Sequence, residues 1–247
     1  MKLNICLLEG VAIQKQLAIE EALLRTDTEN WCIINCGSSP AIVLGISGVL
    51  QEHLDSHEVM MPIIRRFSGG GTVVVDENTL FVTFIFQKQS LDFGQCPQKI
   101  LEWTEQLYQP VFHPEPFRLL ENDYVIGEKK IGGNAQYMTK HCWLHHTTFL
   151  WDYRPEYMQL LKMPPKMPLY RAARGHIDFI DSLKQYYPSM HYLQERLLET
   201  LSKQFVLNRQ RQKEINEIVN RPHRKATEQI LHKKLELDGG FSVPHAF

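Results

Sequence analysis

The sequence reads RRFSGGGTVVVD at residues 65–76, where two arginines and a serine precede three consecutive glycines and a β-branched run. Gly69, Gly70 and Gly71 have no Cβ, so the backbone there can adopt positive φ and a ligand can approach it closely. Successive N–H groups in such a turn can form an anion-binding nest, and the arginines carry planar forks that match carboxylate or phosphate. The stretch predicts a glycine turn that opens a strand beside a phosphate or carboxylate site. A simple tight turn is the alternative.

Two further blocks lie downstream, NDYVIGEKKIGGNAQ at residues 122–136 and HHTTFLWDY at residues 145–153. Together with the glycine stretch they resemble the lipoate–protein ligase family, whose members typically carry RRxSGGGxVxHD, then ND, then KKxxGxAQ, then HHGTLL. The resemblance runs from about residue 10 to at least residue 180 and is closest to a ligase-A-like subgroup of plants and bacteria. The GRGRxxR pattern of biotin ligases is absent. The resemblance implies the class II synthetase-like catalytic fold, which is also that of biotin synthetases.

The composition is that of an ordinary globular protein with one substantial domain. The chain has 247 residues, of which 43% are hydrophobic and 22% charged, and its net charge is −1. This balance gives no argument for nucleic-acid or membrane binding. No apolar run approaches the ~20 residues of a membrane span, and the N-terminus lacks the apolar region of a signal peptide. Five cysteines without a CxxC pair predict reduced thiols and a cytoplasmic protein.

Hydrophobic periodicity predicts helices towards both ends of the chain and strands in its centre. Helices are expected over residues 11–25, 98–109 and 190–219, with a short helix around 51–59 and a frayed tail over 221–247. WCIINC and AIVLGI are expected as adjacent strands joined by a turn. The other expected strand regions are 61–86, with the glycine turn inside it, and 117–153, with glycine turns at Gly127 and at Gly132–Gly133.

This order of elements predicts an α+β fold, a mixed β-sheet flanked by helices. Residues 1–188 are expected to form the catalytic domain. Residues 189–247 are expected to form a C-terminal helical extension that packs on the same domain and ends in the frayed tail. Many ligase-A proteins carry a small C-terminal accessory domain, and we expect no full accessory domain here.

Joining a carboxylate to a lysine amine requires activation, and acyl adenylate formation brings two anions together. Such a site needs fixed positive charge and N–H donors. Regular strand alternation places Lys130 and Gly132 on one face and Lys129 and Ile131 on the other, and the glycine face leaves room for a ligand. The family motif also aligns Lys130 with the lysine that contacts both the acyl carbonyl and the phosphate. We therefore predict Lys130 as the catalytic residue, with a solvated lysine pair as the alternative.

The resemblance also implies the residues that bind ATP. Asp123 is expected near the triphosphate, where it would help to hold magnesium, although Asn122 and Asp123 also suit a turn or cap. Asn134 either orients phosphate or closes a turn. Motif position favours Arg66 as the nucleotide-facing arginine and leaves Arg65 structural or at the rim. The expected ATP-binding set is Arg66, Ser68, Gly69, Gly70, Gly71, Thr72, Val73, Val74, Asn122, Asp123, Lys130, Gly133, Asn134, Ala135, His146 and Thr148.

The histidines and the cysteine in and just before the third block, within residues 140–151, give no metal or thiol site. His141 and His145 are four residues apart, roughly 13 Å along a strand, which is too far to share a zinc ion. The same distance separates Cys142 from His146 and excludes a nucleophilic dyad within one strand. Buried structural roles are the alternative for His145 and His146. The family's cysteine-dependent acyltransferases carry their nucleophile elsewhere, and HPEPFRLLEND, the corresponding segment here, has no cysteine.

The sequence therefore predicts a lipoate–protein ligase-like enzyme. It would use ATP to activate lipoate or octanoate, then acylate a lysine on a carrier domain of a 2-oxoacid dehydrogenase or of the glycine cleavage protein. The acyl tail is expected in an apolar pocket built by Val73–Val75 and Phe81–Ile85. Val75 replaces a family histidine, and Thr147 replaces the glycine of HHGT, so two alternatives stay open. These are an ATP-independent lipoyl or octanoyl transferase and a non-catalytic acyl- or nucleotide-binding partner.

Overall fold

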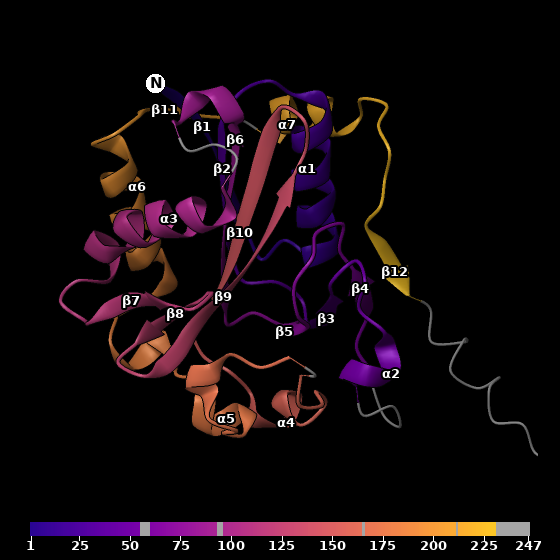
Figure 1. Ribbon diagram of the computed structural model, residues 1–247. Coiled ribbons are helices and arrows are strands. Elements are labelled where there is room, and N and C mark those ends of the chain that lie inside the picture. Colours follow the sequence, from indigo (N-terminus) through magenta and orange to yellow (C-terminus); the bar gives the residue numbers. More distant parts are fainter. Residues whose placement is uncertain (55–59, 93–95, 165, 211, 231–247) are drawn as a thin grey trace, which may run out of the picture.

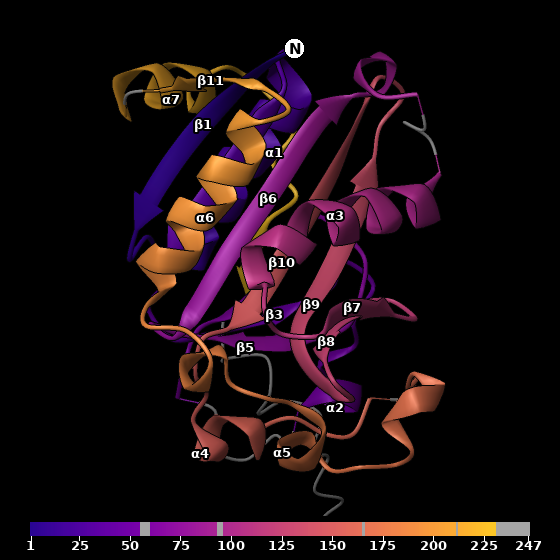
Figure 2. The same ribbon diagram turned by 90° about the vertical axis from the view of Figure 1, so that its left-hand side faces the viewer.

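An eight-stranded mixed sheet forms the centre of the molecule and carries helices on both faces (Figure 1; Figure 2). The computed structural model describes residues 1–54, 60–92, 96–164, 166–210 and 212–230. The expected α+β class, a mixed sheet flanked by helices, is confirmed. In spatial order the strands are β11 (Val206–Arg209), β1 (Lys2–Glu9), β2 (Trp31–Cys36), β6 (Thr79–Gln87), β10 (Cys142–Leu150), β9 (Lys129–Met138), β8 (Asp123–Ile126) and β7 (Phe117–Leu120).

Both faces of this sheet are buried, which explains why its central strand is almost continuously apolar. Along β6, Val82 and Phe84 belong to one core cluster, while Phe81 and Ile85 belong to the other. Helices α3 (Pro97–Phe112) and α6 (Met190–Ser202) cover the first cluster. Helices α1 (Ile13–Thr26) and α7 (Gln212–Val219) cover the second. Each fully buried large side chain contributes roughly 1.5–3 kcal/mol to stability. The two helix–sheet interfaces that bury these side chains therefore stabilise the layered arrangement.

Helix α1 matches its expected range because its apolar residues recur at helical spacing. Ile13, Leu17 and Leu24 lie on one stripe and are buried. The helix joins β1 to β2, which run parallel, as a crossover on one face of the sheet. At the other end of the chain, the Ser189 hydroxyl accepts a hydrogen bond from the Tyr192 amide and caps the start of α6.

A second sheet of four short strands packs against the same face as α1. Its order is β12 (Glu228–Ile230), β4 (Ile63–Arg65), β3 (Ala41–Leu44) and β5 (Val73–Val75). The glycine stretch connects β4 to β5, so its turn lies beside the larger sheet. The short α-helices are α2 (Leu50–His53), α4 (Pro155–Met158) and α5 (His176–Phe179), and 3-10 helices cover Lys88–Ser90, Leu169–Arg171 and Leu183–Gln185. No described helix is long and apolar enough to cross a membrane.

Three local expectations are wrong because segments that are distant in sequence pair with these residues as strands. β2 and β3 are not adjacent, since β2 pairs with β1 and β6, and β3 pairs with β4 and β5. The expected helix over 190–219 is interrupted by β11, which pairs in parallel with β1. Residues 228–230 are not frayed, since they pair with β4. The rest of that expected tail, 231–247, and residues 55–59 of the expected short helix lie outside the described residues.

The expected glycine turn at Gly132–Gly133 is also wrong, because both glycines lie inside β9, whereas Gly127 does make the β8–β9 turn. The register between β8 and β9 shifts at this point: Tyr124 pairs with Gly132, but Val125 pairs with Lys130. Ile131 is therefore an extra residue, as in a β-bulge. Past the bulge the faces exchange, so Lys130 shares a face with Gly133 and not, as regular alternation predicted, with Gly132.

The two neighbouring glycines should respond very differently to an added methyl group. A Cβ on Gly132 would lie 2.7 Å from Cδ1 of the buried Phe149 ring, whereas a Cβ on Gly133 would meet first the flexible end of Lys130, at 3.2 Å. Gly132→Ala should lower the free energy of unfolding by about 1–3 kcal/mol, and Gly133→Ala by no more than about 0.5 kcal/mol. Urea unfolding of both variants measures the difference. Equal losses would contradict the register shift.

Candidate functional site

The Arg66 guanidinium is buried inside the glycine turn and holds it in shape. Its Nη2 donates to the carbonyls of Gly69 (2.6 Å) and Gly71 (2.8 Å), and its Nε donates to Ser68 Oγ at 3.0 Å. Burial lowers the pKa of Arg66 to about 10, against an opposing effect of Glu20, so the side chain stays charged at neutral pH. The fork that the sequence predicts to face the nucleotide thus binds the carbonyls of its own loop and Ser68 in this structure.

The hydrogen bonds from Arg66 to the loop carbonyls determine the direction of the loop amides. The C=O and N–H of a trans peptide point in opposite directions. Because the carbonyls of Gly69 and Gly71 point at Arg66, the next amides, those of Gly70 and Thr72, point away from it. Among the described residues, Thr72 Oγ1 is a buried hydroxyl with no hydrogen-bond partner. The side of the loop that faces away from Arg66 thus offers N–H groups, which are the donors that an anion requires.

The middle of the loop is closely packed, which explains Gly70 and also Gly45, a glycine that follows β3. Gly70 has φ +94°, and a Cβ there would lie 2.8 Å from Nη2 of Arg66. Gly45, which the sequence reading missed, approaches so closely that its Cβ would lie 2.2 Å from the Gly70 carbonyl oxygen. By contrast, Cβ atoms on Gly69 and Gly71 would have nothing within 4 Å. The open side of the loop is therefore at these two outer glycines.

The loop meets β9, and β9 brings the second and third motif blocks to the same face. A Cβ on Gly70 would lie 3.3 Å from Cβ of Ala135. Across the sheet, Ala135 pairs with His146, and Gly133 pairs with Thr148. Asn134 lies on the opposite face of β9 and binds the β7–β8 turn, since its Nδ2 donates to the Asn122 carbonyl at 2.6 Å. The structure therefore places the three blocks side by side on one face of the large sheet.

Lys130 forms an ion pair with Asp123 on this face. The distance from its Nζ to Asp123 Oδ1 is 2.7 Å, and both side chains are more buried than exposed. The other carboxylate oxygen accepts a hydrogen bond from the Tyr170 hydroxyl at 2.9 Å, a partner that the sequence reading missed. Burial, and then the Asp123 carboxylate, raise the pKa of Tyr170, so this hydroxyl stays a donor. Lys129 is exposed, as predicted, although Ile131, which alternation placed on the same face, is buried, while Lys130 points along β9 towards Gly133.

A buried network of hydrogen bonds, in which Ser68, His146 and Glu20 take part, supports the glycine loop from the side of α1. His146 Nε2 lies 2.9 Å from Ser68 Oγ, and His146 Nδ1 lies 3.0 Å from Glu20 Oε2. The other oxygen of Glu20 accepts hydrogen bonds from Thr83 and Gln16. The sequence reading also missed Glu20, and the available signal was a carboxylate on the apolar stripe of the first helix. These hydrogen bonds link the glycine loop (Ser68), the third block (His146) and α1 (Glu20).

His145 lies on the opposite face of β10 and is structural. It is completely buried and lies within 3.2 Å of Tyr124 Oη, Gln136 Nε2 and Thr147 Oγ1. Burial, and then the neighbouring His146, lower the pKa of His145 to about 3. Thr147, which replaces the family glycine, therefore belongs to this core network and does not face the site.

Cys142 and His146 do not form a dyad, as predicted. Cys142 Sγ lies 3.0 Å from Thr139 Oγ1 and 3.3 Å from the Leu24 carbonyl oxygen, while His146 binds Ser68 and Glu20. Burial raises the pKa of the Cys142 thiol. The described cysteines form no disulfide. No activated thiol therefore arises from the third block.

The residues expected to form the acyl pocket are closely packed in this structure. Val75, Phe81 and Ile85 all belong to the second core cluster and are at most 2% exposed. They fill the space between the large sheet, the small sheet and α1. Val73, at the start of β5, is only partly buried. Of the expected pocket, this end of the strand lies nearest to the glycine loop.

The two arginines should contribute unequally to stability. Arg66→Ala removes a charged donor from two carbonyls and a hydroxyl and should lower the free energy of unfolding by about 1–3 kcal/mol. Arg65 donates to the Gly48 carbonyl and pairs with the exposed Glu228, so Arg65→Ala should cost no more than about 1 kcal/mol. The sequence leaves Arg65 either structural or at the rim, and this order favours the rim. Urea unfolding of both variants tests it, and a larger loss at Arg65 would contradict the bracing role.

His145 should make stability depend on pH. Its pKa is about 3 when folded and 6.5 in its ordinary state, so below pH 6.5 the unfolded chain binds more protons and stability falls as pH decreases. The stabilisation is fully present above 6.5, and the loss between pH 7 and pH 5 should be about 2 kcal/mol. In urea titrations His145→Gln should lose this part of the pH dependence, while the exposed His141→Gln should retain it. Identical profiles for His145→Gln and the natural chain would refute the assignment.

A protein-family model and several curated proteins match the sequence of this chain. Residues 12–203 match the family model described as the lipoyl protein ligase A/B catalytic domain. A Plasmodium falciparum protein named inactive lipoate–protein ligase 2 is 30% identical over 197 residues, which are 63% of this chain and 50% of that protein. A Bacillus subtilis lipoate–protein ligase is 29% identical over 144 residues, 55% of this chain and 42% of that protein. The chain thus spans about half the length of these curated relatives.

Solved structures show the same fold. A structure from Thermoplasma acidophilum, described as a bipartite lipoate protein ligase and its E2 lipoyl domain, matches with a TM-score of 0.70 and 20% identity over 89% of this chain and 91% of that chain. A lipoate–protein ligase A bound with ATP matches with a TM-score of 0.70 and 19% identity over 89% and 93% of the two chains. On the match over residues 12–203, the chain belongs to the lipoyl protein ligase A/B catalytic domain family.

Proposed function

We propose that this chain uses ATP to convert lipoate, or a similar medium-chain acid such as octanoate, to an acyl adenylate and then transfers the acyl group to a lysine of a lipoyl carrier domain. The observation that carries the proposal is the placement of Lys130 on the same face of β9 as the outward-facing amides of the glycine loop. Fixed positive charge and N–H donors are what the reaction between two anions requires.

The relatives support the substrates of this proposal. Proteins similar to this chain are named lipoate–protein ligases, and structures of the same fold are described with ATP, with lipoate and with an E2 lipoyl domain. The Plasmodium relative is named inactive, so catalysis is the part of the proposal that needs a direct test. Carrier domains of 2-oxoacid dehydrogenases and of the glycine cleavage protein, and a cytoplasmic location, remain predictions.

In the first step a carboxylate oxygen of the acid attacks the α-phosphorus of ATP, and the bond to the β-phosphate oxygen breaks to release pyrophosphate. The amides of Gly70 and Thr72 would bind phosphate oxygens on the outer side of the loop. The Lys130 ammonium would move from Asp123 to a position between the carboxylate of the acid and the α-phosphate. There its compact positive charge would stabilise the negative charge on both groups. Tyr170 would keep Asp123 oriented by its hydrogen bond.

In the second step the amine of the carrier lysine attacks the acyl carbonyl, AMP leaves, and the new amide loses a proton. Negative charge develops on the carbonyl oxygen, and the same Lys130 ammonium would stabilise it. The chain of Glu20, His146 and Ser68 would hold the loop in position through both steps. Preorganisation of this kind avoids reorganising the site during the reaction.

Asp123 is suited to hold magnesium with the nucleotide. It supplies a single, mostly buried carboxylate, and magnesium in nucleotide sites normally takes one or two protein carboxylates together with phosphate oxygens. When bound, the ion would draw negative charge from the phosphates. Moving Lys130 to the acid would free the oxygen Oδ1 for this role.

Release of pyrophosphate tests the proposal against its two alternatives. The protein is mixed with ATP and magnesium in the presence of lipoate, octanoate or biotin. Pyrophosphate that depends on lipoate or octanoate, with little from biotin, is the expected result. Acyl transfer from an acylated carrier without pyrophosphate would favour the ATP-independent transferase. Binding of ATP or lipoate with neither reaction would favour a non-catalytic partner.

The two adjacent lysines provide a matched pair of variants. Lys130→Ala should lower the rates of adenylation and transfer by at least about 100-fold, the scale for one charge-stabilising group. Lys129→Ala should keep activity within about threefold, because an exposed lysine contributes little. Steady-state rates on folded protein, checked by equal unfolding midpoints, decide the matter. A tolerant Lys130 would remove the catalytic role assigned to it.

A further inference from the structure

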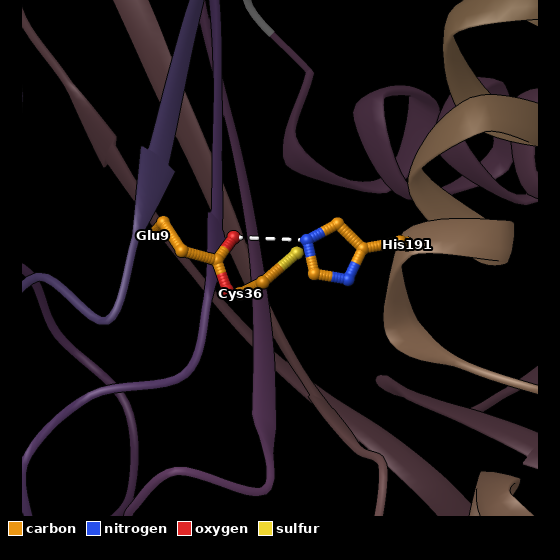
Figure 3. A group of neighbouring side chains, drawn as sticks. All are labelled: Glu9, Cys36 and His191. Atoms are coloured by element: carbon orange, nitrogen blue, oxygen red, sulfur yellow. Dashed lines mark hydrogen bonds and ion pairs between the residues drawn. The ribbon is translucent and has the colours of Figure 1, made fainter.

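A second group of chemically reactive side chains lies on the other face of the large sheet, away from Lys130. Glu9 ends β1, Cys36 ends β2, and the two are direct partners in the parallel pair, so their side chains leave the same face. Helix α6 covers this face, and His191 lies in its first turn. Figure 3 shows the three side chains converging from these three elements.

The three side chains are close enough to share one small ion. His191 Nε2 lies 3.0 Å from Glu9 Oε2, and one ligand atom from each residue lies within 4.8 Å of the other two. Cys36 Sγ also lies 3.1 Å from Oε1 of Gln194, which follows His191 by one helical turn. Cys36 is buried at the base of the group, while Glu9 and His191 are largely exposed above it.

We propose that Glu9, Cys36 and His191 form a zinc site, with water or Gln194 Oε1 as the fourth ligand. A tetrahedral zinc ion bonds sulfur at about 2.3 Å and nitrogen or oxygen at about 2.0–2.2 Å, which requires its ligands to lie roughly 3.3–3.7 Å apart. The distances between the ligand atoms, which are at most 4.8 Å, can shorten to this range when the exposed side chains of Glu9 and His191 rotate. A thiolate beside an imidazole selects zinc over magnesium or calcium.

Binding would convert the Cys36 thiol to a thiolate. Burial, and then Glu9, raise the pKa of Cys36 to about 12, so the thiol keeps its proton at neutral pH in the metal-free protein. The S–H bond breaks as the Zn–S bond forms, and the proton passes to solvent. No change of oxidation state is involved.

The site would fasten α6 to the ends of β1 and β2. Leu193 and Leu197 of α6 already pack in the first core cluster, so the ion would reinforce an existing interface. Ligands from three elements distant in sequence cannot assemble in the unfolded chain, so zinc binding should add to stability. The site is separate from Lys130, which lies on the other face of the sheet.

The test uses the full chain after treatment with a chelator, and cobalt(II) as a spectroscopic probe for zinc. One equivalent of cobalt should bind and give the near-ultraviolet charge-transfer band of a thiolate ligand. Zinc should displace it and raise the melting temperature. Cys36→Ser should abolish the band, and His191→Ala and Glu9→Gln should each weaken zinc binding at least tenfold. Cys96→Ser, at an exposed cysteine outside the group, should behave like the natural chain.

The surface variants keep the test independent of folding, since Glu9 and His191 are exposed and their replacement leaves the core intact. Absence of a thiolate band in the natural chain would overturn the proposal. So would unchanged zinc affinity in both Cys36→Ser and His191→Ala, because the ion would then bind elsewhere in the chain. Neither result would bear on pyrophosphate release, which depends on the other face.

Discussion

The pairing of β9 with its two neighbours is the constraint on which the rest of the site depends. The extra residue Ile131 turns into the core, and Lys130 is thereby brought to the face that carries Asp123 and Gly133. On the opposite face, Gly132 leaves just enough space for the Phe149 ring. One bulge therefore satisfies both a closely packed core and a charged site on two sides of the same strand.

The glycine loop depends on a buried cation in a comparable way. Arg66 binds the carbonyls of alternate glycines, and peptide geometry then turns the following amides outward. A buried guanidinium is costly unless its donors are satisfied, and here the loop satisfies them. The arginine that the sequence assigns to the nucleotide is thus also the internal support of the glycine loop. Glu20, through His146 and Ser68, supports the same loop from α1.

The two faces of the large sheet have separate roles. The face covered by α1 and the small sheet carries the proposed adenylation site, and there the polar groups are linked in hydrogen-bonded chains. The face covered by α3 and α6 is mainly aromatic core, with His145 held neutral inside it and the proposed zinc site at its edge. Variants on the first face therefore test the proposed reaction, and variants on the second face test stability and the proposed zinc site.

The sequence by itself determined the family, the α+β class, helix α1 and the motif blocks, because these depend on local spacing and on residue identity. It also predicted that Lys129 is the exposed lysine of the adjacent pair. Tertiary structure alone decided which strands pair, since hydrogen bonds to distant segments placed β3 in a second sheet and β11 beside β1. It alone supplied the bulge at Ile131, the inward turn of Arg66 and the partners Glu20 and Tyr170. These features arise from contacts between residues far apart in the chain, which no local pattern encodes.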